Sequence, residues 1–237
     1  MDAKFLYVMG ATGAKTTGGD LLTLKCSKTG SIIWAKSFFS LYQEKSDISD
    51  YPTSVAVDKT GNVYVVGTSF APSWKLFFLK YSSEGDRLWL RTTEDHEQND
   101  YPKLGTDRLG NVYIVQGRAD KVSDNYTVPK TLMKKYSSSG DLLWQKLSES
   151  PEASAHFASI VDSSGNIYFT GFYNDSKRDV GDALFLMRYS TEGKKQWTRL
   201  YRGSKEARGF ALVRDSLGNL YVAGTANRDY ITLKYPR

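Results

Sequence analysis

The chain has 237 residues, of which 40% are hydrophobic and 14% aromatic, and this is enough to bury a substantial core. Its 32 Lys and Arg are interspersed with 26 Asp and Glu, so the net charge of +6 forms no basic block and does not favour nucleic acid as a partner. A single cysteine, Cys26, excludes an internal disulfide, and two histidines without a second thiol exclude the usual structural zinc sites.

No apolar stretch approaches the roughly 20 residues that a transmembrane helix needs. The N-terminal segment, residues 1–10, also lacks the basic stretch and long apolar stretch of an export signal. We therefore expect a soluble chain without a membrane span, and the compartment stays open.

In chain order, the first predicted strand is residues 5–9, and the first complete set of strands follows in the next segment. There, residues 54–58 form strand a, 63–69 strand b, 75–81 strand c and 86–93 strand d. The connection from a to b is Asp-x-x-Gly-Asn and that from c to d is Ser-x-x-Gly. Both suit tight hairpins, because Asp bonds to the backbone two residues on and Gly tolerates a positive φ. Four short strands at this spacing are typical of one propeller blade.

The same landmarks recur along the chain. A Gly precedes a Trp by four residues at Gly30 and Trp34, Gly85 and Trp89, Gly140 and Trp144, and Gly193 and Trp197. The Asp-x-x-Gly-Asn turn begins at Asp58, Asp107, Asp162 and Asp215. A strand c ends in a basic residue at Lys25, Lys80, Lys135, Arg188 and Lys234. These landmarks divide the chain into repeat units at about residues 1–50, 51–100, 101–154, 155–207 and 208–237.

We predict one all-β domain over residues 1–237, a β-propeller of about five blades with four antiparallel strands in each blade. The first unit lacks strand a and the last lacks strand d, so the first and last blades are incomplete. No stretch keeps a helical apolar period for more than about 12 residues. A five-bladed ring, part of a larger ring, and self-association through the incomplete end blades all remain open.

The pattern D-x-x-G-N-x-Y-V-x-G-T, then F-L-x-K-Y-S-x-x-G, then x-x-W resembles the bacterial SBBP beta-propeller repeat over essentially the whole chain. The resemblance implies a propeller fold and says little about activity. It also implies a secreted or cell-surface protein, because members of the family often belong to such proteins.

Chain direction places the a-to-b and c-to-d turns on one rim, the plain rim, and the b-to-c and d-to-a loops on the other. This second rim, the variable rim, carries the irregular insertions at residues 10–20, 40–51, 92–101, 116–130, 172–182 and 202–208. Binding residues concentrate on variable loops that a rigid scaffold holds, so we expect function at the variable rim. Sequence drift without function is the competing interpretation.

Aromatic and polar side chains are expected to face the variable rim or the mouth of the channel. These candidate binding residues are Trp74, Tyr51, Tyr101, Lys103, His156, Phe157 and Arg208, with Phe210 beside them. Trp74 is the strongest single candidate, because it lies outside the repeat register and is expected in a b-to-c loop. Packing between blades is the competing explanation. No catalytic residue is predicted, because no carboxylate constellation accompanies the histidines.

Oxygen donors gather in one loop of the variable rim, at Asp175, Asp179 and Asp182, where calcium could bind. The spacing is not that of an EF-hand, so a solvated acidic loop is the default and neither a metal nor another cofactor is predicted. The repeated Trp and Asp residues are interpreted as structural. An ion pair is expected between the Asp that ends strand a and the cation that ends strand c.

These observations predict a non-catalytic binding or scaffold propeller that recognises a protein partner, or other domains of a larger chain, through the variable rim. A lectin-like propeller that binds a glycan is the first alternative, and it would show equivalent aromatic residues in several loops. A hydrolase acting in the channel is the second alternative, and it would need converging His and carboxylate side chains.

Overall fold

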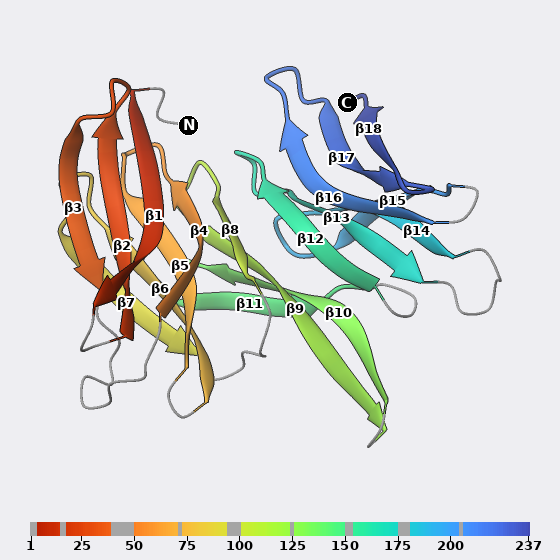
Figure 1. Ribbon diagram of the computed structural model, residues 1–237, viewed down its shortest axis with the longest axis horizontal. Coiled ribbons are helices and arrows are strands. Elements are labelled where there is room, and N and C mark those ends of the chain that lie inside the picture. The colour runs from red at the N-terminus through yellow and green to blue at the C-terminus, as the bar shows by residue number, and fades with distance from the viewer. Residues whose placement is uncertain are drawn as a thin grey trace. The chain divides into compact units, whose positions relative to one another are not determined.

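In the computed structural model, the described residues are 4–14, 18–38, 50–70, 73–93, 101–123, 126–149, 154–174, 181–203 and 206–237. Their regular structure consists of 18 β-strands in five sheets (Figure 1). Three sheets have four strands, and the first and last have three, which confirms the predicted all-β propeller with incomplete end blades. Within these ranges, no helix is long and apolar enough to cross a membrane.

Each sheet corresponds to one repeat unit. The first contains β1 (Phe5–Ala14), β2 (Gly18–Ser27) and β3 (Ile32–Phe38). The second contains β4 (Asp50–Val57), β5 (Val63–Phe70), β6 (Trp74–Tyr81) and β7 (Arg87–Thr93). The third contains β8 (Lys103–Thr106), β9 (Val112–Ser123), β10 (Tyr126–Tyr136) and β11 (Leu142–Leu147). The fourth contains β12 (Ser154–Val161), β13 (Ile167–Asn174), β14 (Asp182–Tyr189) and β15 (Lys195–Tyr201). The fifth contains β16 (Ala207–Arg214), β17 (Leu220–Ala226) and β18 (Asp229–Tyr235).

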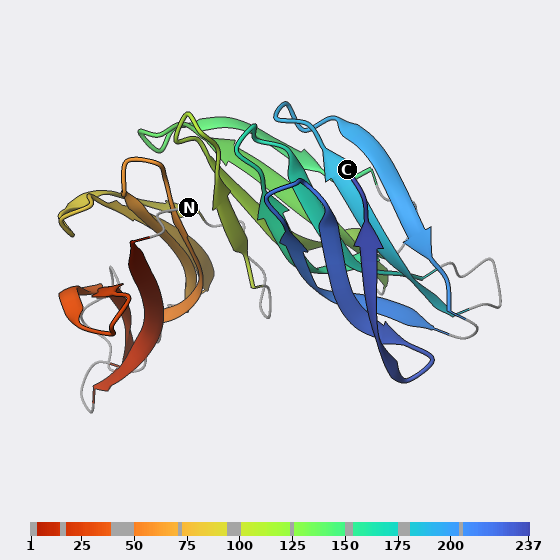
Figure 2. The same cartoon turned by 90° about the horizontal axis from the view of Figure 1, so that it is seen from above.

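The chain forms two compact units. Unit 1 comprises Met1–Val112 and Tyr136–Asp141, and unit 2 comprises Tyr113–Lys135 and Leu142–Arg237. In unit 1, one apolar cluster joins the first two sheets, with Val63, Val65, Phe77 and Leu79 packed against Trp34 and Phe38. In unit 2, the sheet β12–β15 lies beside the sheet β16–β18, and a second cluster fills the space between them (Figure 2).

Two of the predicted irregular insertions are mostly strand, which corrects the expectation for residues 10–20 and 116–130. β1 and β2 stay paired as far as Ala14 and Gly18, and β9 and β10 extend to Ser123 and Tyr126. A longer hairpin pairs backbone N–H and C=O groups that an irregular loop would leave to water or side chains. Strands were not predicted there because these hairpin ends have few alternating apolar residues.

The a-to-b turns are built around the repeated Asp. In the second sheet, Asp58 Oδ1 accepts hydrogen bonds from the backbone N–H groups of Thr60 and Asn62 at 2.9 and 3.0 Å. Asp58 Oδ2 accepts from Asn62 Nδ2 at 2.9 Å and from the hydroxyl of Tyr64 at 3.1 Å. Burial raises the pKa of Asp58, but the hydrogen bonds from Thr60 and Asn62 lower the pKa more, so it lies below its ordinary value.

Asp58→Asn is expected to lower the free energy of unfolding at pH 7 by about 1–3 kcal/mol, because an amide cannot accept this set of hydrogen bonds. Because the pKa of Asp58 is lowered in the folded chain, its contribution to the free energy of unfolding decreases as the pH falls. The Asp58 contribution is present above the carboxyl pKa of the unfolded chain, about 3.9, and is lost as the pH falls through the lower folded value. Urea unfolding of both proteins at pH 7 and pH 3 tests this, and an equal difference at both values would contradict it.

Three of the four a strands carry a bulge that explains the Gly of the adjacent strand b. The register shifts between Pro52 and Ser54 in β4, between His156 and Ala158 in β12, and between Gly209 and Ala211 in β16. The opposing residues are Gly67, Gly171 and Gly224. A Cβ atom at Gly171 would overlap the carbonyl oxygen of Ala155. The Gly of the Tyr-Val-x-Gly sequence is therefore required by close approach of two backbones.

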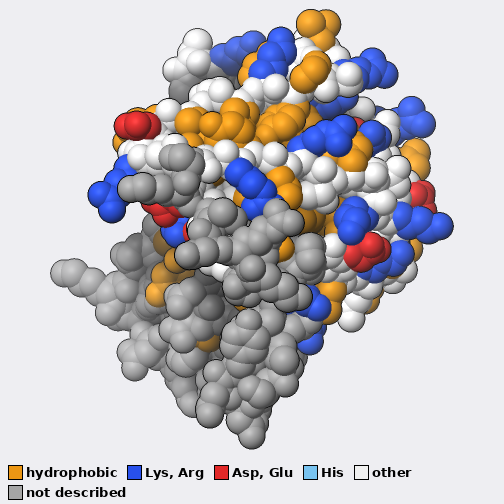
Figure 3. Space-filling model, turned by 90° about the vertical axis from the view of Figure 1, so that its right-hand side faces the viewer, with side chains coloured by type: hydrophobic (Ala, Val, Ile, Leu, Met, Phe, Trp, Pro, Cys, Tyr) orange, Lys and Arg blue, Asp and Glu red, His pale blue; other side chains and the backbone are white. Residues whose placement is uncertain are grey.

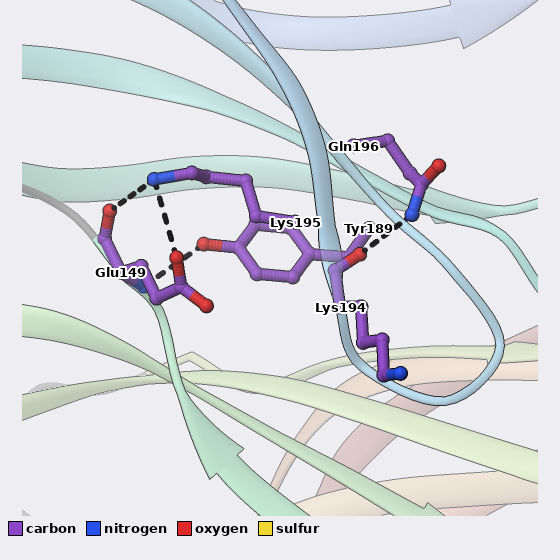
Figure 4. A network of polar contacts seen from close by, with 5 residues as sticks. All are labelled: Glu149, Tyr189, Lys194, Lys195 and Gln196. Carbon is purple, nitrogen blue, oxygen red and sulfur yellow. Dashed lines mark hydrogen bonds and ion pairs between the residues drawn. The ribbon is translucent and has the colours of Figure 1, made fainter.

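A polar network ties the end of β11 to β14 and β15 in unit 2 (Figure 4). The backbone N–H of Glu149 donates to the hydroxyl of Tyr189 at 2.9 Å. Lys195 Nζ donates to the carbonyl of Glu149 at 3.1 Å and lies 3.4 Å from its carboxylate. Burial raises the pKa of Tyr189 to about 12, so the phenol stays neutral at physiological pH.

Candidate functional site

The c-to-d turn of one blade docks on the blade before it. In unit 1, the carbonyl of Ser83, in the turn of the second blade, accepts hydrogen bonds from two side chains of the first blade. These are Lys25 Nζ at 2.8 Å and Trp34 Nε1 at 3.1 Å. Gly85 of the same turn lies against the ring of Trp34. A Cβ atom built on Gly85 would lie 3.1 Å from atoms of that ring. We call the Lys and Trp pair a socket.

The next two sockets have the same construction. Lys80 and Trp89 donate to the carbonyl of Ser138 at 3.1 and 3.3 Å. Lys135 and Trp144 donate to the carbonyl of Thr191 at 3.4 and 3.2 Å. The basic residue two positions after the Trp adds a further bond to the turn, from Arg91 to Gly140 and from Lys146 to Glu192.

The expected ion pair between the strand-a Asp and the strand-c cation is wrong for the second blade. Asp58 and Lys80 form no ion pair there, since Asp58 accepts bonds from its own turn and Lys80 donates to the turn of the next blade. The reason is geometric: the Asp folds back into its hairpin, and the Lys reaches along the strand to the neighbouring blade. The cation thereby becomes a contact between blades.

The fourth socket differs from the first three, because no turn of the described residues fills it. It consists of Arg188 at the end of β14, Trp197 in β15 and Arg199 two residues later. In its place unit 2 has a cleft of about 540 Å³. The cleft is lined by Asp162, Ser164, Asn166, Tyr168, Arg188, Trp197, Arg199, Arg214, Gly218, Leu220, Tyr235, Pro236 and Arg237.

The lining is strongly cationic, with four arginines against one aspartate. Arg188 Nε is buried without a hydrogen-bond partner, and its guanidinium lies 5.7 Å from the ring centre of Tyr168. The Arg199 guanidinium lies 5.5 Å from the ring centre of Trp197. The aspartate, Asp162, is already used as an acceptor by Asn166 and Tyr168. The cleft therefore offers positive charge and unused donors above aromatic surfaces.

One face of the chain is cationic where it is described. Figure 3 shows Lys and Arg side chains in blue around a strip of hydrophobic side chains in orange, with few acidic side chains between them. Such a surface attracts anions over a distance of about 10 Å at ordinary ionic strength.

The candidate binding residues of the variable rim fall into groups within each unit. In unit 1, the rings of Tyr51 and Trp74 lie 6.0 Å apart, and Trp74 is the first residue of β6, so its placement in a loop was wrong. The strand begins earlier because Trp74 pairs with Phe70 across the hairpin. Tyr101 is 64% exposed, and Lys103 is half-buried at the start of β8.

In unit 2, the structure brings Phe157 and Arg208 together with two residues that were not in the predicted binding set, Phe172 and Asp182. The ring of Phe157 lies 5.7 Å from Phe172 and 5.1 Å from Phe210. Arg208 forms an ion pair with Asp182 and lies 4.8 Å from the ring centre of Phe172. His156 instead contacts Phe169 of the core, with the ring centres 6.4 Å apart.

The predicted calcium candidates are described only in part. Asp182 pairs with Arg208 and accepts a hydrogen bond from Asn174, whereas Asp175 and Asp179 lie outside the described residues. No group of three or more His, Cys, Asp or Glu side chains comes together as a metal site in the described ranges.

Sequence reasoning missed the arginine-lined cleft, because the plain rim was judged short and uniform. One signal was present in the sequence. Four Gly-containing turns and four socket Trp residues occur, but the last three turns are each held by the preceding blade. Among the described residues, this offset leaves Trp197 without a turn and Gly30 without a Trp, and nothing there lies within 4 Å of a Cβ built on Gly30.

Comparison with known proteins supports the fold. No curated protein matches the chain in sequence. Among solved structures, the NanB sialidase from Streptococcus pneumoniae aligns with a TM-score of 0.57 at 11% identity, over 87% of this chain and 32% of the sialidase. A variant of the Synechocystis apocarotenoid oxygenase aligns with a TM-score of 0.57 at 9% identity, over 98% of this chain and 58% of the oxygenase. The alpha-L-arabinanase of Penicillium chrysogenum aligns with a TM-score of 0.54 at 12% identity, over 97% of this chain and 70% of the arabinanase.

These neighbours correct the predicted function. The chain spans about a third of the sialidase and a little over half of the oxygenase, and all three neighbours are enzymes. The prediction of a non-catalytic scaffold acting through the variable rim was therefore wrong, because the solved structures that share this fold are enzymes. At these identities the likeness shows the fold alone. The sequence profile of the SBBP family, a beta-propeller repeat, matches residues 39–70 and confirms the resemblance seen in the sequence.

Proposed function

We propose that the arginine-lined cleft of unit 2 binds an anionic ligand, one that presents a carboxylate or phosphate group beside an apolar or planar part. The observation that carries the proposal is Arg188, which lines the cleft and whose Nε atom is buried without a hydrogen-bond partner. A buried donor without a partner is costly, and an oxyanion would satisfy it.

The other lining residues support the same class of ligand. Arg199, Arg214 and Arg237 add planar donors, and guanidinium groups pair well with carboxylate and phosphate oxygens. Trp197 offers an indole face for an apolar or planar part of the ligand. Its Nε1 is in the position from which the other three repeated Trp residues donate to carbonyl oxygens.

Isothermal titration of the full chain with citrate and with inorganic phosphate tests the proposal. We expect saturable binding that weakens as sodium chloride is raised, because ions screen the guanidinium charges. Arg188→Met and Arg199→Met are each expected to weaken binding about tenfold or more, as loss of a hydrogen bond to a charged group costs about 1.5–3 kcal/mol.

Arg91→Met is the matched control, because Arg91 stands two residues after Trp89 as Arg199 does after Trp197. Arg91 already donates to the carbonyls of Gly140 and Ser139 in a filled socket. Its replacement removes the same charge and should leave affinity within about twofold of that of the unchanged chain. Absence of saturable anion binding, or equal losses in all three variants, would refute the proposal.

A further inference from the structure

Two tyrosines occupy equivalent places in neighbouring blades of unit 1, at or just before the start of strand a. The sequence Asp-Tyr-Pro occurs at residues 50–52 and again at residues 100–102. Tyr51 is 48% exposed and Tyr101 is 64% exposed. The proline after each tyrosine restricts the tyrosine backbone to extended conformations, so the two rings are presented by the same kind of backbone. Both lie at the variable rim, outside the apolar cluster of unit 1.

Hydrogen bonds between the two a strands fix the spacing of these tyrosines. β4 and β8 lie side by side (Figure 1). Thr53 Oγ1 donates to the carbonyl of Pro102 at 2.9 Å, and the backbone N–H of Leu104 donates to Ser54 Oγ at 3.1 Å. Thr53 and Pro102 each lie within two residues of a tyrosine. The two rings are therefore held in place before a ligand arrives, so that binding costs little backbone conformational entropy.

A tryptophan and a lysine extend the same surface. The ring of Trp74 lies 6.0 Å from that of Tyr51, with the two planes at 40°, and Trp74 is half-buried at the start of β6. Lys103 is half-buried at the start of β8, two residues after Tyr101. Asp50, which precedes Tyr51, is 1% exposed, so its carboxylate is withdrawn from the surface. The surface that remains combines aromatic rings with positive charge.

We propose that this tyrosine surface, made by Tyr51, Trp74, Tyr101 and Lys103, binds an acidic polysaccharide, a chain of sugars that carry carboxylates. The C–H groups of a sugar ring pack on the electron-rich face of an aromatic ring. The tyrosine hydroxyls and the indole N–H bond to sugar hydroxyls, and the ammonium of Lys103 pairs with a sugar carboxylate. The tyrosine surface belongs to unit 1, so it is a site separate from the anion-binding cleft of unit 2.

Charge favours an acidic sugar chain over other ligands that bind to aromatic rings. A quaternary ammonium ligand also packs on aromatic faces, but the ammonium of Lys103 would repel it. A single-stranded nucleic acid stacks its bases on such rings but needs a groove of positive charge that follows its backbone. The basic residues of this chain are interspersed with acidic ones along the sequence, which does not favour such a groove.

Isothermal titration of the full chain with an oligosaccharide of galacturonic acid tests the proposal. We expect saturable binding, and a neutral oligosaccharide of glucose with the same number of sugars is expected to bind about tenfold more weakly. Tyr51→Ala, Tyr101→Ala and Lys103→Met are each expected to weaken binding of the acidic chain about tenfold. Tyr230→Ala is the matched control, because Tyr230 is 95% exposed but belongs to unit 2, and it should leave affinity within about twofold.

Thermal unfolding of each variant separates loss of the surface from loss of the fold, and the exposed tyrosines should tolerate Ala with an unchanged midpoint. Failure of the acidic chain to bind, or binding that both tyrosine variants leave unchanged, would overturn the inference. Equal binding of the neutral chain would also overturn it, because charge would then contribute nothing. Binding that is lost in Arg188→Met but kept in the tyrosine variants would overturn it while supporting the proposed function of the cleft. An oligodeoxythymidylate that displaces the acidic chain and binds more tightly would overturn it in favour of nucleic acid.

Discussion

Gly171→Ala is expected to lower the free energy of unfolding by about 2–4 kcal/mol, one of the largest effects of any single added methyl group in this chain. The new Cβ would overlap the carbonyl oxygen of Ala155 and crowd the Cα of His156. Both are backbone atoms of the bulged strand β12, so no side-chain rotation relieves the overlap. Either the bulge shifts or the pairing of β12 with β13 opens, and urea unfolding measures the loss.

Gly10→Ala is the matched control for this prediction. Gly10 occupies the same place in the strand-b sequence of the first blade, whose described sheet has no strand a, and nothing lies within 4 Å of a Cβ built there. Its replacement is expected to leave stability unchanged or raise it by up to about 1 kcal/mol, because Ala has less conformational freedom to lose than Gly. Equal losses in the two variants would show that the bulge is not the cause.

The second large effect compares a filled socket with the open one. Lys80 is 8% exposed, and its ammonium donates to the carbonyl of Ser138 at 3.1 Å. Burial lowers the pKa of Lys80, so desolvation offsets part of what this bond contributes. Lys80→Met is expected to destabilise the chain by about 1–3 kcal/mol, because it leaves the turn carbonyl without its charged donor.

Arg188→Met removes the equivalent cation from the fourth socket and should have the opposite outcome. Arg188 holds no turn, and its Nε is buried without a partner, so a Met side chain of similar reach is expected to be neutral or mildly stabilising. Thermal unfolding of the two variants side by side provides the measurement. A loss for Arg188→Met as large as that for Lys80→Met would mean that Arg188 already has a structural role.

The fold could be predicted from the sequence because its signals are local. Each Asp-x-x-Gly-Asn turn is completed within five residues by bonds such as Asn62 to Asp58, and each Ser-x-x-Gly turn has its Gly at positive φ. Such hairpins depend on neighbours in sequence, so their recurrence reveals strand order and blade number.

The cleft could not be predicted in the same way, because it arises from contacts across about fifty residues. Trp34 contacts Ser83, which is 49 residues away, and the sequence alone does not say that a turn belongs to the preceding socket. The predicted rim residues show the same limit. The ion pair between Arg208 and Asp182 joins two blades, and His156 turns toward Phe169 in the core instead of the rim.

Because each turn contacts the socket of the preceding blade, a substitution in a turn affects the packing of that preceding blade. A substitution in the turn at Gly193 belongs by sequence to the fourth blade, but the ring that it disturbs is Trp144 of the third. Similarly, a change at Ser138 would release Lys80 and Trp89 of the second blade. A substitution in one turn should therefore reduce protection from hydrogen exchange in the preceding blade, whose Lys and Trp hold that turn.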